Sequence, residues 1–452
     1  MDRSKHHPML VLYGVFAACC TITACANADD YLFVNGELIT MTNERTLEAD
    51  LRVQDGRIAE IGVSLPQDDA TVIDLAGGYL MPGLTEMHAH VPAPGAGQEY
   101  RDEVLYLYIA NGVTTIRGML GNPAHLTLRD ALNEGEVAGP RLITSGPSFN
   151  GNSVSSPAQA QRMVRAQHAA GYDFLKIHPG LTLAEYDAMA ATARELDMVF
   201  AGHVPMEVGL LHALESGQAT VDHLDGYIQA LVSDLSADEG GLFLPRLLPR
   251  VDEQRIATVV AATYAANAWV VPTQTLLENY AAAASNLQAL LERPQNDYLP
   301  RSLLARYQRA LSPDNRSADA DAAAAYNTLR ARLIGELHAH GVGILLGSDA
   351  PQIFNVPGFS LHRELASMVT AGLSPFEALE TGTTNPARYF DMQAQFGRLE
   401  PGLSADFIWL SGNPLVDIAN TKKIQGVMVR GRWLDRGTLD NGLAEIRSRN
   451  QE

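Results

Sequence analysis

Several side chains that could bind metal ions follow short apolar stretches, each about as long as one strand of a sheet. His88 and His90 end the first such stretch, and His203, His223 and Asp349 follow or end later ones. Residues two apart on a strand point to the same side, so His88 and His90 can bind one metal ion from one wall. Imidazole and carboxylate groups suit zinc and similar divalent ions. The spacing therefore predicts a metal site at which these five residues meet.

Lys176 lies in another of these stretches. It is one of four lysines in the chain, which has 29 arginines. An ordinary ammonium group beside metal ions would be repelled. Carbamylation by carbon dioxide would turn the amine into a carboxylate-like group with two oxygens, able to bridge two metal ions. The alternative is a lysine that packs at a strand end and pairs with an acid. Lys176 lies at the tip of the fourth of the candidate strands described below, and this place favours the carbamate.

A second His-Ala-His sequence, at His338 and His340, provides a contrast. It ends Leu329–His340, whose apolar spacing is typical of a helix. Residues two apart on a helix point about 200° apart, so these two cannot share a metal ion. We expect them at a helix end, where the helix dipole favours histidine.

The metal-binding residues need a scaffold that brings the ends of several strands together. Between residues 81 and 396, apolar runs alternate with helical stretches, which is typical of an α/β fold with a parallel sheet. Eight runs are candidate strands: Leu84–His90, Thr114–Met119, Arg141–Ser145, Phe174–His178, Val199–Val204, Thr220–Leu224, Trp269–Thr275 and Gly343–Ser348. They predict a (β/α)8 TIM-like barrel, whose active sites lie at the carboxyl ends of the strands. The alternative is a doubly wound open sheet. The sequence does not support it, because no glycine-rich phosphate-binding motif follows the early candidate strands.

Both ends of the chain have a different texture. Residues 29–80 and 397–440 contain short β-prone runs separated by Asn35-Gly36, Asp55-Gly56 and Arg430-Gly431. Asn-Gly and Asp-Gly are strong hairpin signals. The two segments predict one small β-sandwich domain formed from both termini.

The connection before the last candidate strand is long. Residues 276–335 include alanine-rich runs and a polar patch, Asp314–Asp321, and they predict a helical insertion in the barrel. The insertion is either a lid over the catalytic face or a helical addition away from it, and the sequence favours neither.

Residues 1–28 have the pattern of a secretory signal peptide. A positively charged start precedes Met9–Ala24, an apolar run shorter than the roughly 20 residues that a membrane-spanning helix needs. A lipobox-like sequence precedes Cys25, whose lipidation would attach the protein to a membrane, whereas cleavage after Ala28 would release it. We favour the lipoprotein, and both interpretations place the mature protein in the periplasm or at the outer membrane.

Charge and cysteine content exclude several classes of protein. The chain has 33 Lys and Arg against 52 Asp and Glu, and its formal net charge of −19 argues against nucleic-acid binding. Its three cysteines all lie in the first 25 residues. The body therefore has no disulfide framework, cysteine nucleophile or thiolate metal site.

Together these motifs resemble the metal-dependent amidohydrolase superfamily. The residues that carry the resemblance are Met81-Pro82-Gly83-Leu84, His88-Ala89-His90, Lys176, His203, His223, Asp349 and the later run Gly397–Asp406. The branch that they resemble is the imidazolonepropionase-related one, which includes prolidase-like dipeptidases with a carbamylated lysine. Glu86 and Gly118 depart from the usual pattern and leave the subgroup open.

The resemblance implies two divalent metal ions, with zinc as the first expectation. His88, His90 and Asp349 would bind the more buried ion, His203 and His223 the more exposed one, and carbamylated Lys176 would bridge the two. Asp349 would also carry the proton from water to the leaving amine. Tyr227 would either donate to the oxyanion or pack at the rim. His178 and Arg117 would either bind a substrate carboxylate or make structural pairs inside the barrel.

The sequence therefore predicts a hydrolase of amide bonds in small molecules, with dipeptides or N-acyl amino acids as the preferred substrates. One alternative is a cyclic amide, lactone or ester cleaved at the same site. Another is an envelope binding protein without catalysis, although Asp349 argues against it because a binding module needs no proton shuttle. The oligomeric state does not follow from the sequence.

Overall fold

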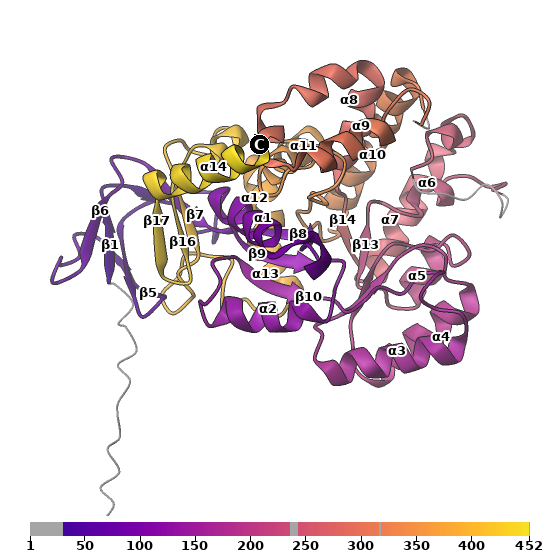
Figure 1. Cartoon of the computed structure of the whole chain (residues 1–452), viewed down its shortest axis with the longest axis horizontal. Coiled ribbons are helices and arrows are strands. Elements are labelled where there is room, and N and C mark those ends of the chain that lie inside the picture. Colours follow the sequence, from indigo (N-terminus) through magenta and orange to yellow (C-terminus); the bar gives the residue numbers. More distant parts are fainter. Residues whose placement is uncertain (1–29, 236–242, 316–317, 452) are drawn as a thin grey trace, which may run out of the picture.

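The computed structural model describes residues 30–235, 243–315 and 318–451. They form a barrel of strands and helices with a two-sheet β domain at one side, seen at the left of Figure 1. The predicted signal segment, including Cys25, lies outside the described residues. Within those residues, no helix combines the length and the apolar character that crossing a membrane requires.

Seven parallel strands of the barrel form two sheets, in which neighbours follow the order of the chain. The strands are β8 (Leu84–Ala89), β9 (Val113–Gly118) and β10 (Arg141–Thr144), then β11 (Leu175–Ile177), β12 (Phe200–Gly202), β13 (Thr220–Asp222) and β14 (Trp269–Val271). Each coincides with one of the first seven predicted strands. On one side the two sheets are joined by parallel bridges, such as that between Ser145 and Phe174.

The predicted eighth strand, Gly343–Ser348, is irregular. It forms a parallel bridge from Ile344 to Val270 of β14, and Leu346 accepts a hydrogen bond from Met87 of β8, so it still completes the ring. At its end, the backbone N–H of Ser348 donates to the carboxylate of Glu86 at 2.8 Å instead of continuing a strand ladder. The barrel prediction is confirmed, but this strand is less regular than the sequence indicated.

Helices on the outside of the ring connect the strands, and local sequence signals fix their ends. α3 (Pro157–Ala170) begins after Ser156, whose side chain accepts from the N–H of Gln159, and ends at Gly171 in the left-handed region. α4 (Leu183–Glu195) begins with a capping box between Thr182 and Glu185. The remaining helices between strands are α1 (Gln98–Ala110), α2 (Ala124–Asn133), α5 (Leu210–Glu215), α6 (Tyr227–Ala230), α7 (Ile256–Ala265), α8 (Gln274–Leu291), α9 (Arg301–Ala310) and α10 (Ala320–Ala339). α11 (Phe359–Thr370), α12 (Pro375–Gly382) and α13 (Thr384–Tyr389) follow the eighth strand.

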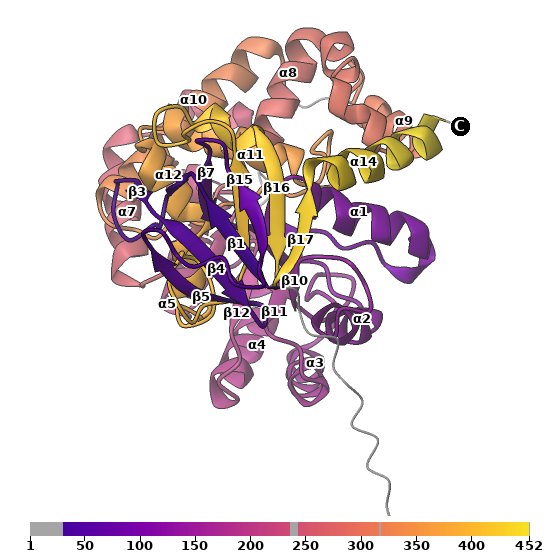
Figure 2. The same ribbon diagram turned by 90° about the vertical axis from the view of Figure 1, so that its left-hand side faces the viewer.

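The β domain is a sandwich formed from both ends of the chain, as predicted. One sheet has the order β5-β4-β1-β6, and the other the order β17-β16-β15-β7-β2-β3 (Figure 2). The strands are β1 (Tyr31–Val34), β2 (Glu37–Leu38), β3 (Leu47–Glu48), β4 (Asp50–Gln54), β5 (Arg57–Gly62), β6 (Thr71–Asp74), β7 (Tyr79–Pro82), β15 (Phe407–Leu410), β16 (Ile424–Val429) and β17 (Arg432–Asp435). Phe33, Leu51, Leu80, Phe407 and Met428 are buried together between the sheets.

The turn predictions in this domain were partly wrong. Hairpins form at Asp55-Gly56, between β4 and β5, and at Arg430-Gly431, between β16 and β17. Asn35-Gly36 makes no hairpin, because β1 pairs with β4 and β6 while β2 lies in the other sheet. The dipeptide carries the chain between sheets, and Gly36 is required because a Cβ there would lie 2.8 Å from the backbone carbonyl oxygen of Gly78.

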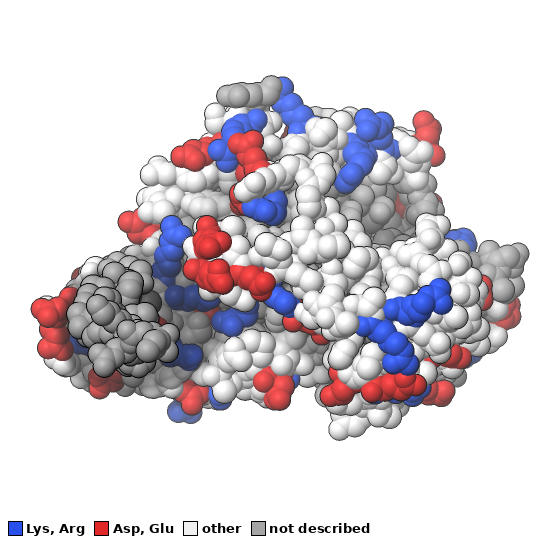
Figure 3. All heavy atoms as spheres, turned by 60° about the horizontal axis from the view of Figure 1, so that its bottom comes forward, with Lys and Arg blue, Asp and Glu red and all other residues white. Residues whose placement is uncertain are grey.

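The predicted insertion, residues 276–335, is helical. It contains most of α8 and α10, with α9 between them, at the top right of Figure 1. Leu290, Tyr298 and Tyr307 from this region pack in one apolar cluster with Ile446 of the C-terminal helix α14 (Arg436–Gln451). On the face drawn in Figure 3, basic side chains are interspersed with acidic ones and form no continuous basic patch.

α10 supports the catalytic face through one arginine. Arg330 is fully buried and donates to the backbone carbonyl oxygens of His223 at 2.6 Å and Pro272 at 2.7 Å. We expect Arg330→Leu to lower the free energy of unfolding by about 3 kcal/mol or more, because two buried carbonyls lose their donor. Arg332→Leu, on the same helix but in an exposed pair with Glu253, should change it by less than about 0.5 kcal/mol. Urea denaturation of both variants measures the difference, and equal losses would contradict this role of Arg330.

Candidate active site

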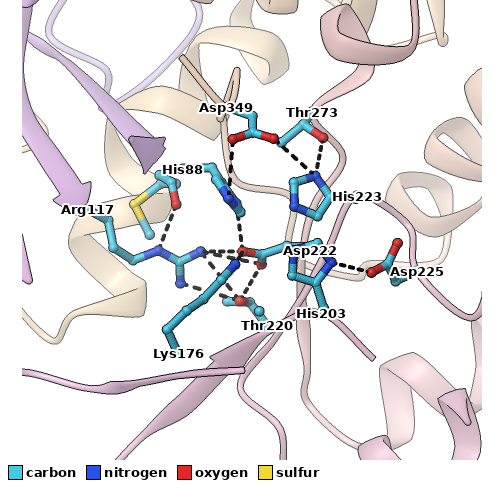
Figure 4. Close-up of polar contacts among 12 residues, drawn as sticks. His88, Arg117, Lys176, His203, Thr220, Asp222, His223, Asp225, Thr273 and Asp349 are labelled. Atoms are coloured by element: carbon cyan, nitrogen blue, oxygen red, sulfur yellow. Dashed lines mark hydrogen bonds and ion pairs between the residues drawn. The ribbon is translucent and has the colours of Figure 1, made fainter. Parts of the chain in front are cut away.

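The predicted metal ligands meet at the carboxyl ends of the barrel strands (Figure 4). Nε2 of His90 lies 2.7 Å from Oδ1 of Asp349, and Nε2 of His88 lies 3.7 Å from the same oxygen. Ligand atoms of these three residues lie within 4.8 Å of one another, as one metal ion requires. The eighth strand brings Asp349 to this place, where the N–H of His90 donates to the carbonyl of Ala350.

The other two histidines complete the cluster. The rings of His203 and His223 lie 4.5 Å apart between centroids, and His223 lies equally far from His88. Nδ1 of His203 contacts Asp225 at 2.6 Å, and Nδ1 of His223 contacts Thr273 at 2.7 Å. These contacts engage one ring nitrogen and leave Nε2 available, which is how metal-binding histidines are usually oriented.

Burial sets the protonation of the histidines. It lowers the pKa of His88 well below its ordinary value, with a smaller contribution from the nearby Lys176 cation. Burial and the neighbouring His88 do the same for the pKa of His223. Both rings are therefore neutral near pH 7 and have a lone pair to offer.

Lys176 is fully buried, and its ammonium nitrogen has no hydrogen-bond partner among the described residues. Its closest charged neighbour is Oδ2 of Asp222, 3.8 Å away. Burial lowers the pKa of Lys176 to about 8, which increases the fraction of neutral amine that can react with carbon dioxide. Gly202, at φ +125°, leaves space beside the side chain, since a Cβ there would lie 3.1 Å from Nζ. The buried amine is thus left without a hydrogen-bond partner among the described residues, and a glycine rather than a larger residue lies beside it.

Asp222 is the principal residue that the sequence analysis missed. It is fully buried, with Oδ2 2.8 Å from Nδ1 of His88 and Oδ1 3.4 Å from Arg117. Burial alone would raise the pKa of this carboxyl, but Arg117 and Lys176 hold it below its ordinary value. The carboxylate thus lies directly behind two predicted ligands.

Strand alternation is broken at this point, which explains how neighbouring residues both face the site. His223 has φ +61°, in the left-handed region, so it does not turn away from Asp222 as the next residue of a strand would. Asp349 has φ +63° in the same way. Such backbone is uncommon outside glycine and clusters at functional sites.

Glu86, one of the two departures noted in the sequence, ties two ligand segments together. Its carboxylate accepts from the N–H of His88 at 2.9 Å and from the N–H and hydroxyl of Ser348 at 2.8 and 2.5 Å. Burial raises the pKa of Glu86 to about 8. The residue fixes β8 against the strand that carries Asp349.

For Tyr227 and Arg117 the sequence left two roles open, and both side chains are buried and paired within the protein. The hydroxyl of Tyr227 contacts Oγ1 of Thr263 on α7 at 2.8 Å and is fully buried, so it is not placed to donate to an oxyanion. Arg117 is fully buried as well, and its Nε donates to the carbonyl of Met87 at 2.7 Å. Arg117 makes the structural pair inside the barrel that was the alternative to binding a substrate carboxylate.

His178 is the remaining predicted residue. It follows β11 and is partly exposed, and its ring lies 4.9 Å from that of His203. Its buried Nδ1 has no hydrogen-bond partner among the described residues. Burial, with Lys176 next in effect, lowers the pKa of His178 to about 2, so the ring is uncharged. It can exchange neutral hydrogen bonds with a substrate but offers no positive charge.

His338 and His340 lie at the end of α10, as predicted. His338 pairs with Glu377 at 3.1 Å, and Nδ1 of His340 contacts the backbone carbonyl of Glu336. Neither residue belongs to the cluster described above.

Comparison with known proteins gives the family. The model of the Amidohydrolase family matches residues 79–434, and the chain belongs to this family. The superfamily predicted from the sequence is thereby confirmed. Family membership supports the predicted enzyme class, a metal-dependent hydrolase of carbon–nitrogen bonds.

The similar curated proteins match over a short region. D-hydantoinase of Geobacillus stearothermophilus is 41% identical over 88 residues, which are 19% of this chain and 18% of that protein. Dihydroorotase of Bacillus thuringiensis (strain Al Hakam) is 37% identical over 91 residues, 20% of this chain and 21% of that protein. The chain thus matches about a fifth of the length of these relatives.

Solved structures match over nearly the whole chain and show the same fold. Bottromycin amidohydrolase has a TM-score of 0.71 at 22% identity, covering 93% of this chain and 90% of that one. A Xaa-Pro dipeptidase with bound methionine in the active site has a TM-score of 0.68 at 19% identity, covering 90% and 100%.

A prediction concerns Asp222. We expect Asp222→Asn to weaken metal binding by about 10- to 100-fold, because a neutral amide no longer orients His88 as a carboxylate does. Metal content after dialysis against graded chelator measures the loss. Asp187→Asn is the matched control, since Asp187 pairs with His212 at 2.6 Å on the surface. The two variants retaining metal equally would argue against this role of Asp222.

Proposed function

We propose that this protein is a binuclear metal-dependent hydrolase that cleaves amide bonds in small molecules. The observation that carries the proposal is the convergence of four histidines, a carboxylate and an unsatisfied buried lysine at the carboxyl end of the barrel. Zinc is the first candidate metal, because the donors are imidazole and carboxylate. His88, His90 and Asp349 would hold one ion, His203 and His223 the other, and the carbamate of Lys176 would bridge them.

The residues of the chain have distinct tasks in this mechanism. The metal ions, when bound, supply Lewis-acid polarisation of a carbonyl and activation of water. Asp349 lies among His88, His90 and His223, with its carboxylate 3.9 Å from Nδ1 of His223, where it can accept a proton from the attacking water and deliver it to the leaving nitrogen. His178, beside His203, is placed to donate a neutral hydrogen bond to the substrate carbonyl.

Two substrate classes fit this site. Dipeptides and N-acyl amino acids are the class that the sequence resemblance favours. Cyclic amides are the second class, and the matches to D-hydantoinase and dihydroorotase favour it. The two differ in charge, because dipeptides and N-acyl amino acids carry a free carboxylate and a cyclic amide need not. A non-catalytic binding protein would need no residue that carries a proton, so this alternative explains the presence of Asp349 less well.

We also propose that residues 1–28 direct the protein out of the cytoplasm, with Cys25 as the lipidated residue. Membrane fractionation of the wild type and of Cys25→Ser tests this. Recovery of both in the same soluble fraction would contradict lipidation.

Lys176 provides the test of the mechanism. We expect the wild type to hold two divalent ions per chain and to hydrolyse amides in a library of dipeptides, N-acyl amino acids and cyclic amides when bicarbonate is present. Lys176→Ala should lose more than about 100-fold in kcat/KM, since loss of an outer partner of a ligand already costs 10- to 100-fold. A carbamate signal in ¹³C NMR after growth with labelled bicarbonate should disappear in this variant.

The control is Lys423→Ala, which removes an exposed lysine of the β domain. It should retain metal, carbamate signal and activity. Full activity of Lys176→Ala, or a purified wild type without stoichiometric metal, would contradict the proposed function.

A further inference from the structure

The segment that begins at Asp349 has a strained backbone. Asp349, Ile353 and Phe354 have positive φ angles of +63°, +40° and +62°. Such angles are uncommon for residues other than glycine, and at a β-branched residue such as Ile353 they are a genuine outlier. Strained backbone persists only where the surrounding structure holds it in place. Residues 349–356, the Asp349 segment, therefore depend on partners elsewhere in the structure.

Asn279 of α8, in the helical insertion, is one of these partners. Its side chain is fully buried, and its amide nitrogen donates to the backbone carbonyl of Ile353 and to Oδ1 of Asn355, each at 2.8 Å. Nη1 of Arg293, in the connection after α8, donates to Oδ1 of Asn279 at 2.7 Å. The amide nitrogen of Asn355 donates in turn to the carbonyl of Ser348. One chain of hydrogen bonds thus runs from the insertion to the end of the eighth strand.

Tyr307 of α9 is the second partner from the insertion. Its hydroxyl donates to the backbone carbonyl of Pro351 at 3.0 Å, and its ring centroid lies 5.4 Å from that of Phe354. Phe354 and Val356 belong to the same buried apolar cluster as Tyr307 and Leu290 of α8. The insertion therefore contacts the segment both at its backbone carbonyls and at its apolar side chains.

We propose that Asn279 and Tyr307 are positioning residues, through which the helical insertion directs the carboxylate of Asp349 at the metal site. The proposal rests on the proposed function, in which Asp349 binds a metal ion and carries the proton. A released segment would relax toward commoner backbone angles and move this carboxylate from its place 2.7 Å from Nε2 of His90. A displacement of about 1 Å can cost about 100-fold in rate.

This role differs from both alternatives that the sequence left open for the insertion. A lid would act by covering the substrate, and a helical addition away from the site would leave catalysis unchanged. Here the insertion acts on the protein itself, because its side chains hold the backbone that carries a metal-binding residue.

Four variants test the proposal. Asn279→Ala and Tyr307→Phe each remove a donor to the Asp349 segment. Asn296→Ala and Tyr298→Phe are the matched controls, because both are buried residues of the same types in the insertion, and their hydrogen-bond partners lie in the insertion itself and in α14. Circular dichroism confirms that each variant is folded.

Hydrogen–deuterium exchange of the full chain, as purified and after chelator treatment, measures the segment directly. We expect peptides that cover residues 349–356 to exchange at least about tenfold faster in Asn279→Ala and Tyr307→Phe than in the wild type, a difference of about 1.4 kcal/mol in local opening. Peptides from β12 and β13 should exchange at the wild-type rate. The two controls should leave exchange of the segment unchanged.

Metal retention and kinetics report whether Asp349 is displaced. Asn279→Ala and Tyr307→Phe should lose metal at a lower chelator concentration than the wild type. At saturating metal, kcat for an amide that the wild type hydrolyses should fall at least about tenfold while KM stays within about twofold, because the proton transfer is impaired rather than substrate binding. The controls should keep the wild-type values.

The outcomes separate this proposal from the proposed function. Unchanged exchange of the segment in both variants would overturn the positioning role, and so would faster exchange with unchanged metal retention and kcat. Equal effects in the controls would also overturn it, since they would reflect general destabilisation. A wild type that binds metal but hydrolyses no amide would overturn the proposed function, and exchange and metal retention would then decide the positioning role alone. A wild type that binds no metal would overturn both.

Discussion

Asp222 connects groups that could not otherwise share the barrel interior. Arg117 is a fully buried cation beside this one carboxylate, and the fully buried amine of Lys176, which is cationic as long as it is protonated and not carbamylated, lies 3.8 Å from it. Burying either cation without a partner would cost several kcal/mol. The same carboxylate contacts His88, and Thr220 donates to it at 2.6 Å. The metal-binding wall and the interior below it therefore depend on one interaction network, and the strands that supply it, β8, β9, β11 and β13, come from both sheets of the barrel.

The network also explains why the side chain of Arg117 lies inside the barrel. A guanidinium group has five donors in a fixed plane, and here they are directed to Met87, Asp222, Thr220 and Tyr389. A residue that fixes the strands to each other cannot also reach the mouth. Charged groups thus hold the barrel strands together from inside.

Much of this arrangement could be predicted from the sequence because it follows from strand periodicity. His88 and His90 lie two apart on a regular strand, and the apolar runs before His203 and His223 locate two further tips. The errors occur where local rules are overridden by tertiary contacts. Asn35-Gly36 has the sequence of a hairpin turn, yet its strands find better partners in different sheets.

The remaining site residues were hidden for similar reasons. Asp222 precedes His223, and alternation alone would send one of the two outward; the left-handed backbone at His223 cannot be read from the residue types. Tyr227 begins a short helix after Gly226, and the direction of its side chain depends on Thr263, which is 36 residues away. The barrel interior that accepts Arg117 exists only after the ring has closed.

The pairing of β7 with β15 determines how late during synthesis of the chain the metal site can form. β7 continues almost directly into β8, which carries His88 and His90, and the N–H of Gly83 between them donates to the carbonyl of Asp406. The anchor of the first metal-binding strand is therefore synthesised more than 300 residues after the strand itself. A growing chain cannot fix this wall while it is being made, so the metal site is assembled only once synthesis is almost complete.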